Sequence, residues 1–524
     1  MTTLHQGHPL TASAHLHVRS LRTVLAAVIT SLAWVGFVPT ALAAPQATLL
    51  SETRLVEAAA AGGSLVLPAG LLVLSQPLVI TRDFSLSGAG PEDTTIQNTG
   101  SGTAVRVEGG AVVSLGDLRI DATGSSEAGS FGTDLIQVLD GSLTLDRTYL
   151  SGARYGAPDD LKPYGYGVAL FVAGSATATV TSTLFQLNEL VVVEATGTST
   201  VSLRQTSFDR NIHGAFAEED ATLTVSDSLI VGTEESALTV RGRATATITS
   251  NTFSVNGVDP ATGYASFDAL RIGEEATVSL RGNLIEGNPR YALSLYGTAT
   301  VTAEGNTYRS NGGHDEVEDV FRSSLLLEDS SRYVSNGDQF LDNPGGAIEV
   351  IHDSSMLLDT PTITGNGSYA SVWVDDTADV VLIGANFADN EGGLFVMGEA
   401  TLFLERGSFT TTASDAVDAS GSSEVTAVEA TFADNDGAGI YAYGGAVVTV
   451  HRSTFRSNLA GLVASETASF DIEGSAFTQN TGAGVLFLDT SSGSVRSSVF
   501  QGNGGLAVDV RPTAEVVLEG NEER

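Results

Sequence analysis

The sequence predicts an all-β solenoid, in which a single chain winds into a stack of parallel β-strand coils. Three observations predict this fold. A bulky apolar residue followed by Asn three positions later recurs at steps of 22, 23 or 24 residues. Each period contains three short runs of alternating apolar and polar residues. The 58 Gly residues suit tight turns, and no period contains a stretch with helical spacing. A fixed period of this size is typical of solenoids.

The repeat is defined by fourteen apolar anchors, and twelve of them have Asn three residues later. Eleven of the thirteen steps between anchors are 22–24 residues long. Weaker anchors at Ile96, Ile120 and Leu150 extend the array towards the N-terminus. We expect roughly 18 coils, with the anchors stacked in the core. The Asn side chains should form hydrogen bonds from coil to coil. They should lie at a turn with a left-handed backbone, a conformation that Asn tolerates. The anchors are Phe185, Phe208, Ile230, Phe253, Ile285, Tyr308, Phe340, Ile363, Phe387, Phe409, Phe432, Phe455, Phe477 and Phe500.

One period, Gly437–Asn458, shows the expected internal order. Ile440–Ala442 forms the first run, Val448–Val450 the second, and a third run ends at Phe455 before the Asn turn. A leucine-rich repeat has a similar period, but it requires Leu at fixed positions and has one strand per repeat. Here the apolar positions accept Val, Phe, Ile and Ala, and each period has three strands.

The turns also carry a family resemblance. Asn and Gly recur there, as in Arg281–Asn283 and Glu304–Asn306. In this pattern, residues 50–524 resemble the pectin-lyase-like superfamily of right-handed parallel β-helices, and its secreted bacterial repeat proteins most of all. The resemblance implies a right-handed, single-stranded β-helix with a substrate groove beside the first strand of each coil. Residues Leu55–Ala61 read as a short capping helix, and Gly62–Gly70 resembles the family's entry into the first coils. No comparable cap is expected at the C-terminal end.

The catalytic motifs of this superfamily are mostly missing. Of the polygalacturonase set, only the Asp-Asp pair occurs, at Asp159-Asp160 and Asp375-Asp376. Lys162 is the only lysine and has Asp160 two positions before it, so the Arg-x-Lys motif is absent. The resemblance therefore indicates a fold and leaves the chemistry open.

The first residues have the features of a targeting segment. Arg19 and Arg22 precede an apolar run, Val24–Val38, and small residues follow at Ala41–Ala43. This order predicts a secretory signal over residues 1–43, followed by a β-helix domain over residues 44–524. A retained anchor is the alternative, because the charged leader is long. We expect a secreted protein, either extracellular, periplasmic or at the cell surface, with no stable membrane insertion.

The charge limits the partners. With 25 basic and 62 acidic residues the formal net charge is −37. Such a field repels nucleic acid and anionic membranes, so no nucleic-acid partner is expected. A polyanionic glycan would need a bridging cation. The absence of Cys excludes disulfides and thiolate metal sites. We expect a monomer.

Four periods are longer than the others, and each extra stretch lies between the Asn turn and the next first strand. Insertions at a single register project from one side of a solenoid, which is usually its working face. One insertion contributes Lys162, Tyr164 and Tyr166 as candidate ligand-binding residues. The stretches are Asp121–Asp134, Ala153–Gly167, Gly257–Asp268 and Gly312–Arg322. In the last of them, Asp315, Glu316, Glu318 and Asp319 are candidate ligands for a hard cation such as calcium.

Alignment of the first strands gives a column of residues that should face outward beside these loops. Trp373 is expected to be exposed as a platform for a sugar ring, with Arg271 as a further ligand-binding residue. Glu349 lies one coil before Trp373, and Asp375 and Asp376 follow it. Strand geometry puts the Glu349 and Asp375 backbones about 8 Å apart, so the two carboxyls are candidates for inverting glycoside hydrolysis. The full column is Phe171, Val192, Ala217, Thr239, Arg271, Ser294, Leu326, Glu349, Trp373, Val396, Asp418 and Tyr441.

Two hypotheses for the function follow. The first is a non-catalytic surface or adhesion-type solenoid that binds a polysaccharide or another cell-surface component. The alternative is a polysaccharide-degrading enzyme, a glycoside hydrolase or a lyase, with its site on the first-strand face. The missing motifs favour the first hypothesis, and the clustered loops with Trp373 favour the second.

Overall fold

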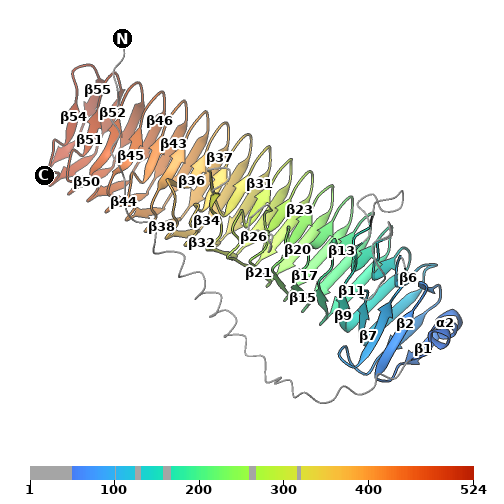
Figure 1. The fold of residues 1–524 in the computed structure, drawn as a ribbon. Coiled ribbons are helices and arrows are strands. Elements are labelled where there is room, and N and C mark those ends of the chain that lie inside the picture. Colours follow the sequence, from blue (N-terminus) through green and yellow to red (C-terminus); the bar gives the residue numbers. More distant parts are fainter. Residues whose placement is uncertain (1–49, 101, 124–131, 157–166, 259–266, 316–319) are drawn as a thin grey trace, which may run out of the picture. The chain divides into compact units, whose positions relative to one another are not determined.

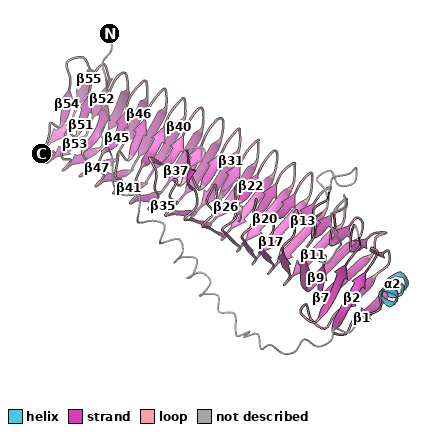
Figure 2. Cartoon of the chain, in the orientation of Figure 1, coloured by secondary structure: helices cyan, strands magenta, loops and turns pink. Residues whose placement is uncertain are grey.

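The computed structural model is an all-β parallel solenoid of about 19 turns with a single short helix near the start (Figures 1 and 2). It describes residues 50–100, 102–123, 132–156, 167–258, 267–315 and 320–524. Residues Thr48–Arg524 form one compact unit, and the expected leader, residues 1–43, lies outside the described residues. The predicted fold class is confirmed, with one turn more than the repeat indicated.

Each regular coil contributes three strands, as in β45 (Ala438–Ala442), β46 (Val447–His451) and β47 (Thr454–Arg456). These are the three runs expected in this period. Each strand pairs in parallel with its counterparts in the coils before and after it. The first strands make an 18-stranded ladder, which we call sheet B. The second and third strands make a 36-stranded sheet, sheet A.

Sheet B carries the face expected to be functional. It begins at β3 (Leu78–Ile80), and its middle part contains the longer strand β36 (Ala370–Val374). Around β36 the order is β22 (Leu270–Ile272), β25 (Leu293–Leu295), β30 (Leu325–Leu327), β33 (Ile348–Val350), β36, β39 (Gly393–Val396), β42 (Val417–Ala419) and β45, and the last strand is β54 (Val508–Val510). The residues of neighbouring strands are matched one to one, except for an irregularity between Ala370 and Val372 where β36 pairs with β39. A side chain in one coil therefore lies directly beside its counterpart in the next.

Sheet A consists of two ladders. The second strands run from β1 (Gly63–Val66) to β55 (Glu515–Glu519), and we call this ladder A1. The third strands run from β2 (Gly70–Leu74) to β56 (Glu522–Glu523). The long strands β7 (Val112–Asp121) and β9 (Ser142–Ser151) belong to both ladders and join them into one sheet.

The aromatic anchors stack in the core as predicted. The Phe432 ring lies 5.1 Å from Phe409 and 4.8 Å from Phe455, between centroids, with interplanar angles of 16° and 7°. The space for these rings comes from small residues on sheet B. A Cβ atom at Gly439 would lie 2.5 Å from Cδ1 of Phe455, so any larger residue there would displace the ring.

The predicted Asn ladder is also present. Asn435 donates from Nδ2 to Oδ1 of Asn458 at 2.8 Å and to the carbonyl of Phe409 at 3.2 Å. Where Thr233 replaces Asn, its hydroxyl donates to Oδ1 of Asn256 at 2.9 Å. The expectation that Asn takes the left-handed backbone is wrong: the preceding residue does so, as at Ser457 with a φ of 57°. The Asn side chain is therefore free to point inward and satisfy buried backbone groups.

The start of the solenoid is covered by helix α2 (Glu52–Ala61), which begins three residues before the predicted start at Leu55. The Ser51 hydroxyl accepts a hydrogen bond from the backbone N–H of Arg54, which satisfies one free donor of the first turn. Leu55 and Ala59 are the buried residues of the helix and join the core of the first coils. The helix thus shields strand edges that would otherwise be open to pairing.

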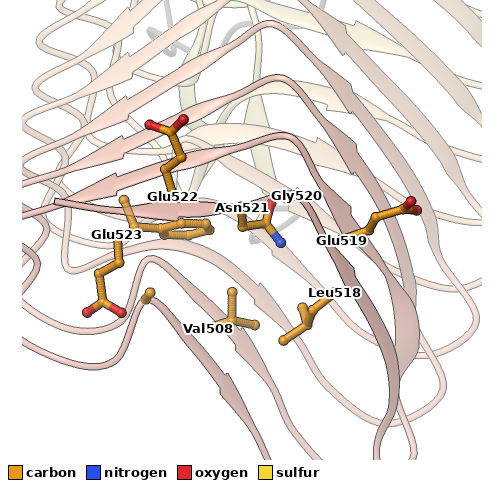
Figure 3. Close-up of a pocket in the computed structure, with 9 residues that line it drawn as sticks. Val508, Leu518, Glu519, Gly520, Asn521, Glu522 and Glu523 are labelled. Carbon is orange, nitrogen blue, oxygen red and sulfur yellow. The ribbon is translucent and has the colours of Figure 1, made fainter.

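The last coil has a hollow lined by apolar residues, including Val508 and Leu518, and by acidic residues (Figure 3). The carboxylates of Glu519, Glu522 and Glu523 point in three different directions and do not converge on a common point. This hollow is the exposed edge of the final coil and lacks the arrangement of a binding site.

We expect Phe432→Ala to lower the free energy of unfolding by about 3–5 kcal/mol, because Phe432 is fully buried and stacked on both sides. Urea denaturation of both proteins measures the difference. Phe321→Ala is the control, since the Phe321 side chain is half exposed. Equal losses in the two variants would mean that the stack does not stabilise the core.

Candidate functional site

The outward row of sheet B differs from the expected column at three coils. Val192, Ala217 and Val396 are buried in the core, and the residues in register with Trp373 and Arg271 are instead Glu194, Phe216 and Phe395. Two of the three strands, β13 (Val191–Ala195) and β39, contain consecutive apolar residues and are buried on both faces, so alternation does not reveal which residue points outward. The observed row is Gln137, Phe171, Glu194, Phe216, Thr239, Arg271, Ser294, Leu326, Glu349, Trp373, Phe395, Asp418 and Tyr441.

A pocket lies over the middle of this row. Glu349 of β33 and Trp373 of β36, which are in register, both line it. One wall comes from the described end of the fourth insertion, where β28 (Gly313–Asp315) and β29 (Val320–Arg322) form an antiparallel pair. The other pocket residues are Tyr291, Phe321, Arg322, Ser323, Gly345, Ser368, Tyr369 and Ala370. The structure therefore brings together the candidate acid Glu349, the candidate sugar-binding ring of Trp373 and the fourth insertion.

Glu349 is held by groups that the sequence did not reveal. The Tyr291 hydroxyl donates to Oε2 of Glu349 at 2.9 Å, and Nη1 of Arg322 donates to the Tyr291 oxygen at 3.4 Å. Burial raises the pKa of Glu349, and the Tyr291 hydrogen bond and the Arg322 charge oppose this shift. Burial also raises the pKa of Tyr291, so the phenol stays protonated and keeps donating. The carboxyl is thus fixed in position and retains its proton to a higher pH than an exposed glutamate.

Trp373 is half-buried, whereas the sequence predicted an exposed side chain. Its indole stacks on the Phe395 ring at 5.3 Å between centroids and an angle of 17°. Tyr369, 70% exposed, lies 5.1 Å from the same Phe395 ring. We call these three rings the aromatic platform. Tyr369 was missed because it precedes its strand, where no alternation identifies an outward residue.

Asp375 and Asp376 lie beside the pocket and do not line it. Both follow β36 at a turn, where the Asp376 N–H donates to Oδ1 of Asp375 at 2.7 Å. Asp376 has a φ of 58° and accepts a hydrogen bond at Oδ2 from the His352 N–H at 3.2 Å. Asp376 therefore stabilises the turn. In Asp375, the oxygen that accepts the bond from Asp376 is Oδ1, and Oδ2 takes no part in this contact. Asp375 is diagonal to Glu349, one coil later and two residues further along the strand.

Two further acids adjoin the pocket region. Glu328 is placed like Asp375 but one coil before Glu349, and its charge adds to the rise in the pKa of Glu349. Asp418 lies between Phe395 and Tyr441 of the adjacent coils. Burial, together with the nearby Asp415 carboxylate, raises the pKa of Asp418 to about 7.

Arg271 belongs to a different part of the face. Its guanidinium lies over the Tyr296 ring, 5.0 Å from the centroid, and it does not line the pocket. Close by, Asp268 accepts a hydrogen bond from the Ser294 hydroxyl at 2.7 Å and pairs with Arg290 at 3.3 Å. Burial raises the pKa of Asp268. This region is a closed polar network at the edge of the third insertion.

The remaining candidates cannot be placed. Lys162, Tyr164 and Tyr166, as well as Glu316, Glu318 and Asp319, lie outside the described residues. Asp315 is described only as part of β28, without its side chain. Within the described ranges, no three His, Asp or Glu side chains are grouped so as to hold a metal ion. The calcium hypothesis therefore stays a prediction that concerns the fourth insertion.

The sequence profile of the family described as "Right handed beta helix region" matches residues 161–308, 193–366, 323–477 and 440–522. Together these overlapping matches span more than half of the chain. The chain belongs to this right-handed β-helix family. No curated protein matches its sequence.

Several solved β-helices are similar to the protein. A periplasmic alginate epimerase, AlgG, is 13% identical over 65% of this chain and 78% of its own, with a TM-score of 0.41. A PL6 alginate lyase in complex with a trisaccharide is 10% identical over 68% and 84%, with a TM-score of 0.43. The catalytic unit of a GH87 alpha-1,3-glucanase from Streptomyces thermodiastaticus is 13% identical over 90% and 65%, with a TM-score of 0.25. At such values the similarity extends to the β-helix architecture and says nothing about activity.

No helix within the described ranges is long and apolar enough to span a membrane. Helix α2, with ten residues, is the helix seen there.

We expect Asp418→Asn to stabilise the protein at pH 8 and to have little effect at pH 4. In the unfolded chain an aspartate has a pKa of about 3.9, whereas the pKa of Asp418 in the folded protein is about 7. Between these two pKa values the folded state binds more protons than the unfolded state, so the free energy of unfolding falls as the pH rises. Asn does not titrate, so the variant does not lose this stability. Urea denaturation at several pH values measures the effect. Asp436→Asn, at an exposed aspartate, is the control, and the same pH trend in both variants would contradict the assignment to Asp418.

Proposed function

We propose that the protein cleaves an extracellular polysaccharide at the sheet B pocket, with Glu349 as proton donor. The observation that carries the proposal is the Glu349 carboxyl, held by Tyr291 beside the aromatic platform and raised in pKa by burial. A general acid must keep its proton near the working pH, and burial achieves this for carboxylic acids. Glu349 combines this property with access to a pocket.

The aromatic platform supplies the binding surface. The flat C–H faces of sugars pack against aromatic rings, and the Trp373 and Tyr369 rings line the same pocket as the Glu349 carboxyl. A sugar resting on these rings would bring a glycosidic oxygen within reach of Glu349. The chain's net charge of −37 favours a neutral glycan, because an anionic one would be repelled unless a cation bridged the two.

Hydrolysis requires a second carboxylate. In an inverting reaction Glu349 would transfer its proton to the leaving oxygen as the C–O bond breaks. The second carboxylate would take a proton from the water whose oxygen bonds to the sugar carbon. Asp375 and Glu328 both have Cα positions about 8 Å from that of Glu349, on opposite sides. We assign the role to Asp375, because it lies on the Trp373 side of Glu349, where the sugar would rest.

Binding without cleavage remains the second candidate function. The aromatic platform supports it independently of the acids, since Trp373 and Tyr369 both pack against the buried Phe395 ring and both line the pocket. A surface or adhesion-type solenoid would use this platform and leave Glu349 a purely structural partner of Tyr291.

We expect Glu349→Gln to abolish cleavage of a bound glycan while leaving affinity largely intact, because the amide keeps the shape and cannot give up a proton. Wild-type turnover should fall as the pH rises through the pKa of Glu349, since only the protonated carboxyl is the acid. Release of reducing ends from a panel of neutral and uronate-containing polysaccharides, with and without calcium, measures the activity. Asp375→Asn should also abolish it and Glu328→Gln should not.

We expect Trp373→Ala to weaken glycan binding by about 1–2 kcal/mol. Its thermal melt should fall slightly, because the variant loses the stacking of Trp373 on Phe395. Calorimetry on the glycan identified in the panel measures the affinity. Tyr441→Ala is the matched control, because Tyr441 occupies the same outward row three coils further on. Unchanged affinity in the Trp373 variant would place the site elsewhere. A glycan that wild type binds through Trp373 but never cleaves would establish the binding function.

A further inference from the structure

Ladder A1 of sheet A carries an array of hydroxyl side chains that the sheet B site does not use. The first and third residues point outward in six consecutive strands, β11 (Thr177–Thr181), β14 (Thr200–Arg204), β17 (Thr222–Ser226), β20 (Thr245–Thr249), β23 (Thr277–Arg281) and β26 (Thr300–Glu304), and so do the corresponding residues of β9. All fourteen positions hold Thr or Ser, and we call them the hydroxyl array. One column is Ser142, Thr177, Thr200, Thr222, Thr245, Thr277 and Thr300, and the other is Thr144, Thr179, Ser202, Thr224, Thr247, Ser279 and Thr302.

The array has clear borders. The next strand, β31 (Arg332–Asn336), places Arg332 and Val334 in the two columns and ends the pattern. No charged residue occupies the array, although 17% of the chain is charged. Charged groups lie along its sides, such as the Arg281–Glu304 and Arg243–Asp220 ion pairs. The array is thus a neutral rectangle in a strongly acidic protein.

The array is periodic in two directions. Adjacent strands place equivalent side chains about 4.8 Å apart, and alternate residues along a strand are about 6.6 Å apart. The pairings run without a register shift from β9 to β26, so the pattern is unbroken over about 29 Å. Threonine is β-branched and stiff at χ1, so its hydroxyl repeats with the backbone. The hydroxyl oxygens of Thr222 and Thr245 lie 3.3 Å apart and share a hydrogen bond, so these two groups face each other along the column.

These properties restrict the partner. A charged polymer finds no counter-charge on the array, and a protein surface without a repeat of its own cannot match the array's spacing in two directions. The prism surface of hexagonal ice is uncharged, and its oxygen atoms recur with a short spacing and a longer perpendicular one, close to those of the array. Each ice oxygen donates and accepts hydrogen bonds, as does each hydroxyl. The threonine methyl groups fit between the water positions.

We propose that the hydroxyl array binds the ordered water of an ice surface. Each hydroxyl contributes little by itself, and attachment results from many contacts made at once on a rigid face. A single bulky charged side chain near the centre should therefore hold the whole face away from the ice. The proposal is independent of the sheet B site, because the two faces belong to different sheets.

The test compares Thr224→Lys with Thr449→Lys. Both residues occupy the third position of a ladder A1 strand and are half-exposed, but Thr224 is central in the array and Thr449 lies outside it. The purified full chain is exposed to slowly growing ice, and the fraction incorporated into the ice and the thermal hysteresis are measured. Wild type and Thr449→Lys should enter the ice and shape its crystals. Thr224→Lys should be incorporated about tenfold less, with an unchanged thermal melt.

Three results would overturn the proposal. The first is exclusion of wild type from the ice, as for a protein without ice affinity. The second is equal incorporation of the two lysine variants. The third is sedimentation showing wild-type dimers that Thr224→Lys abolishes, without ice incorporation, which would make the array a contact between two copies of the chain. Cleavage or binding of a glycan at Glu349 and Trp373 would be unaffected in each case, so the two proposals fail separately.

Discussion

Parallel pairing in constant register is the constraint on which the rest of the structure depends. Each coil has to return its three strands to the same positions beside the previous coil, and the chain achieves this with circuits of nearly constant length. Because residues are matched one to one, a residue type chosen at one position is repeated in space as a row. The phenylalanine stack, the asparagine ladder, the outward row of sheet B and the hydroxyl array are all such rows.

The same constraint determines where variation is tolerated. A longer connection between the third strand and the next first strand leaves the pairing intact, and the four insertions lie there. The base of the fourth insertion turns back on sheet B through the pair of Gly313 with Arg322, which brings Arg322 over Tyr291. Residues that differ from coil to coil therefore lie mainly beside sheet B, whereas ladder A1 repeats the same residue types. The acids Glu328, Glu349 and Asp418 lie on the diverse face.

Much of the fold could be predicted from the sequence, because the rows repeat. The spacing of Phe432, Phe455 and Phe477 fixed the coil length, and the Asn three residues later marked the turn. The outward row was harder, since β39 contains Leu394, Phe395 and Val396 in succession and no alternation separates them. The contacts of Glu349 were beyond reach, because Tyr291 lies 58 residues away and no repeat relates the two. Single contacts between different coils leave no periodic signal.

The asparagine ladder has an electrical consequence. Within each uninterrupted run of Asn, the Nδ2 group donates to the Oδ1 atom of the following coil, so the amide dipoles of a run point the same way along the stack. Hydrogen bonds aligned in a chain polarise one another, and the strength of each depends on the length of the uninterrupted run. The amide chain is interrupted at Thr233 and Thr412, which leaves its longest run between Asn256 and Asn390. The most strongly polarised part of the spine thus spans the coils that carry Glu349 and Trp373.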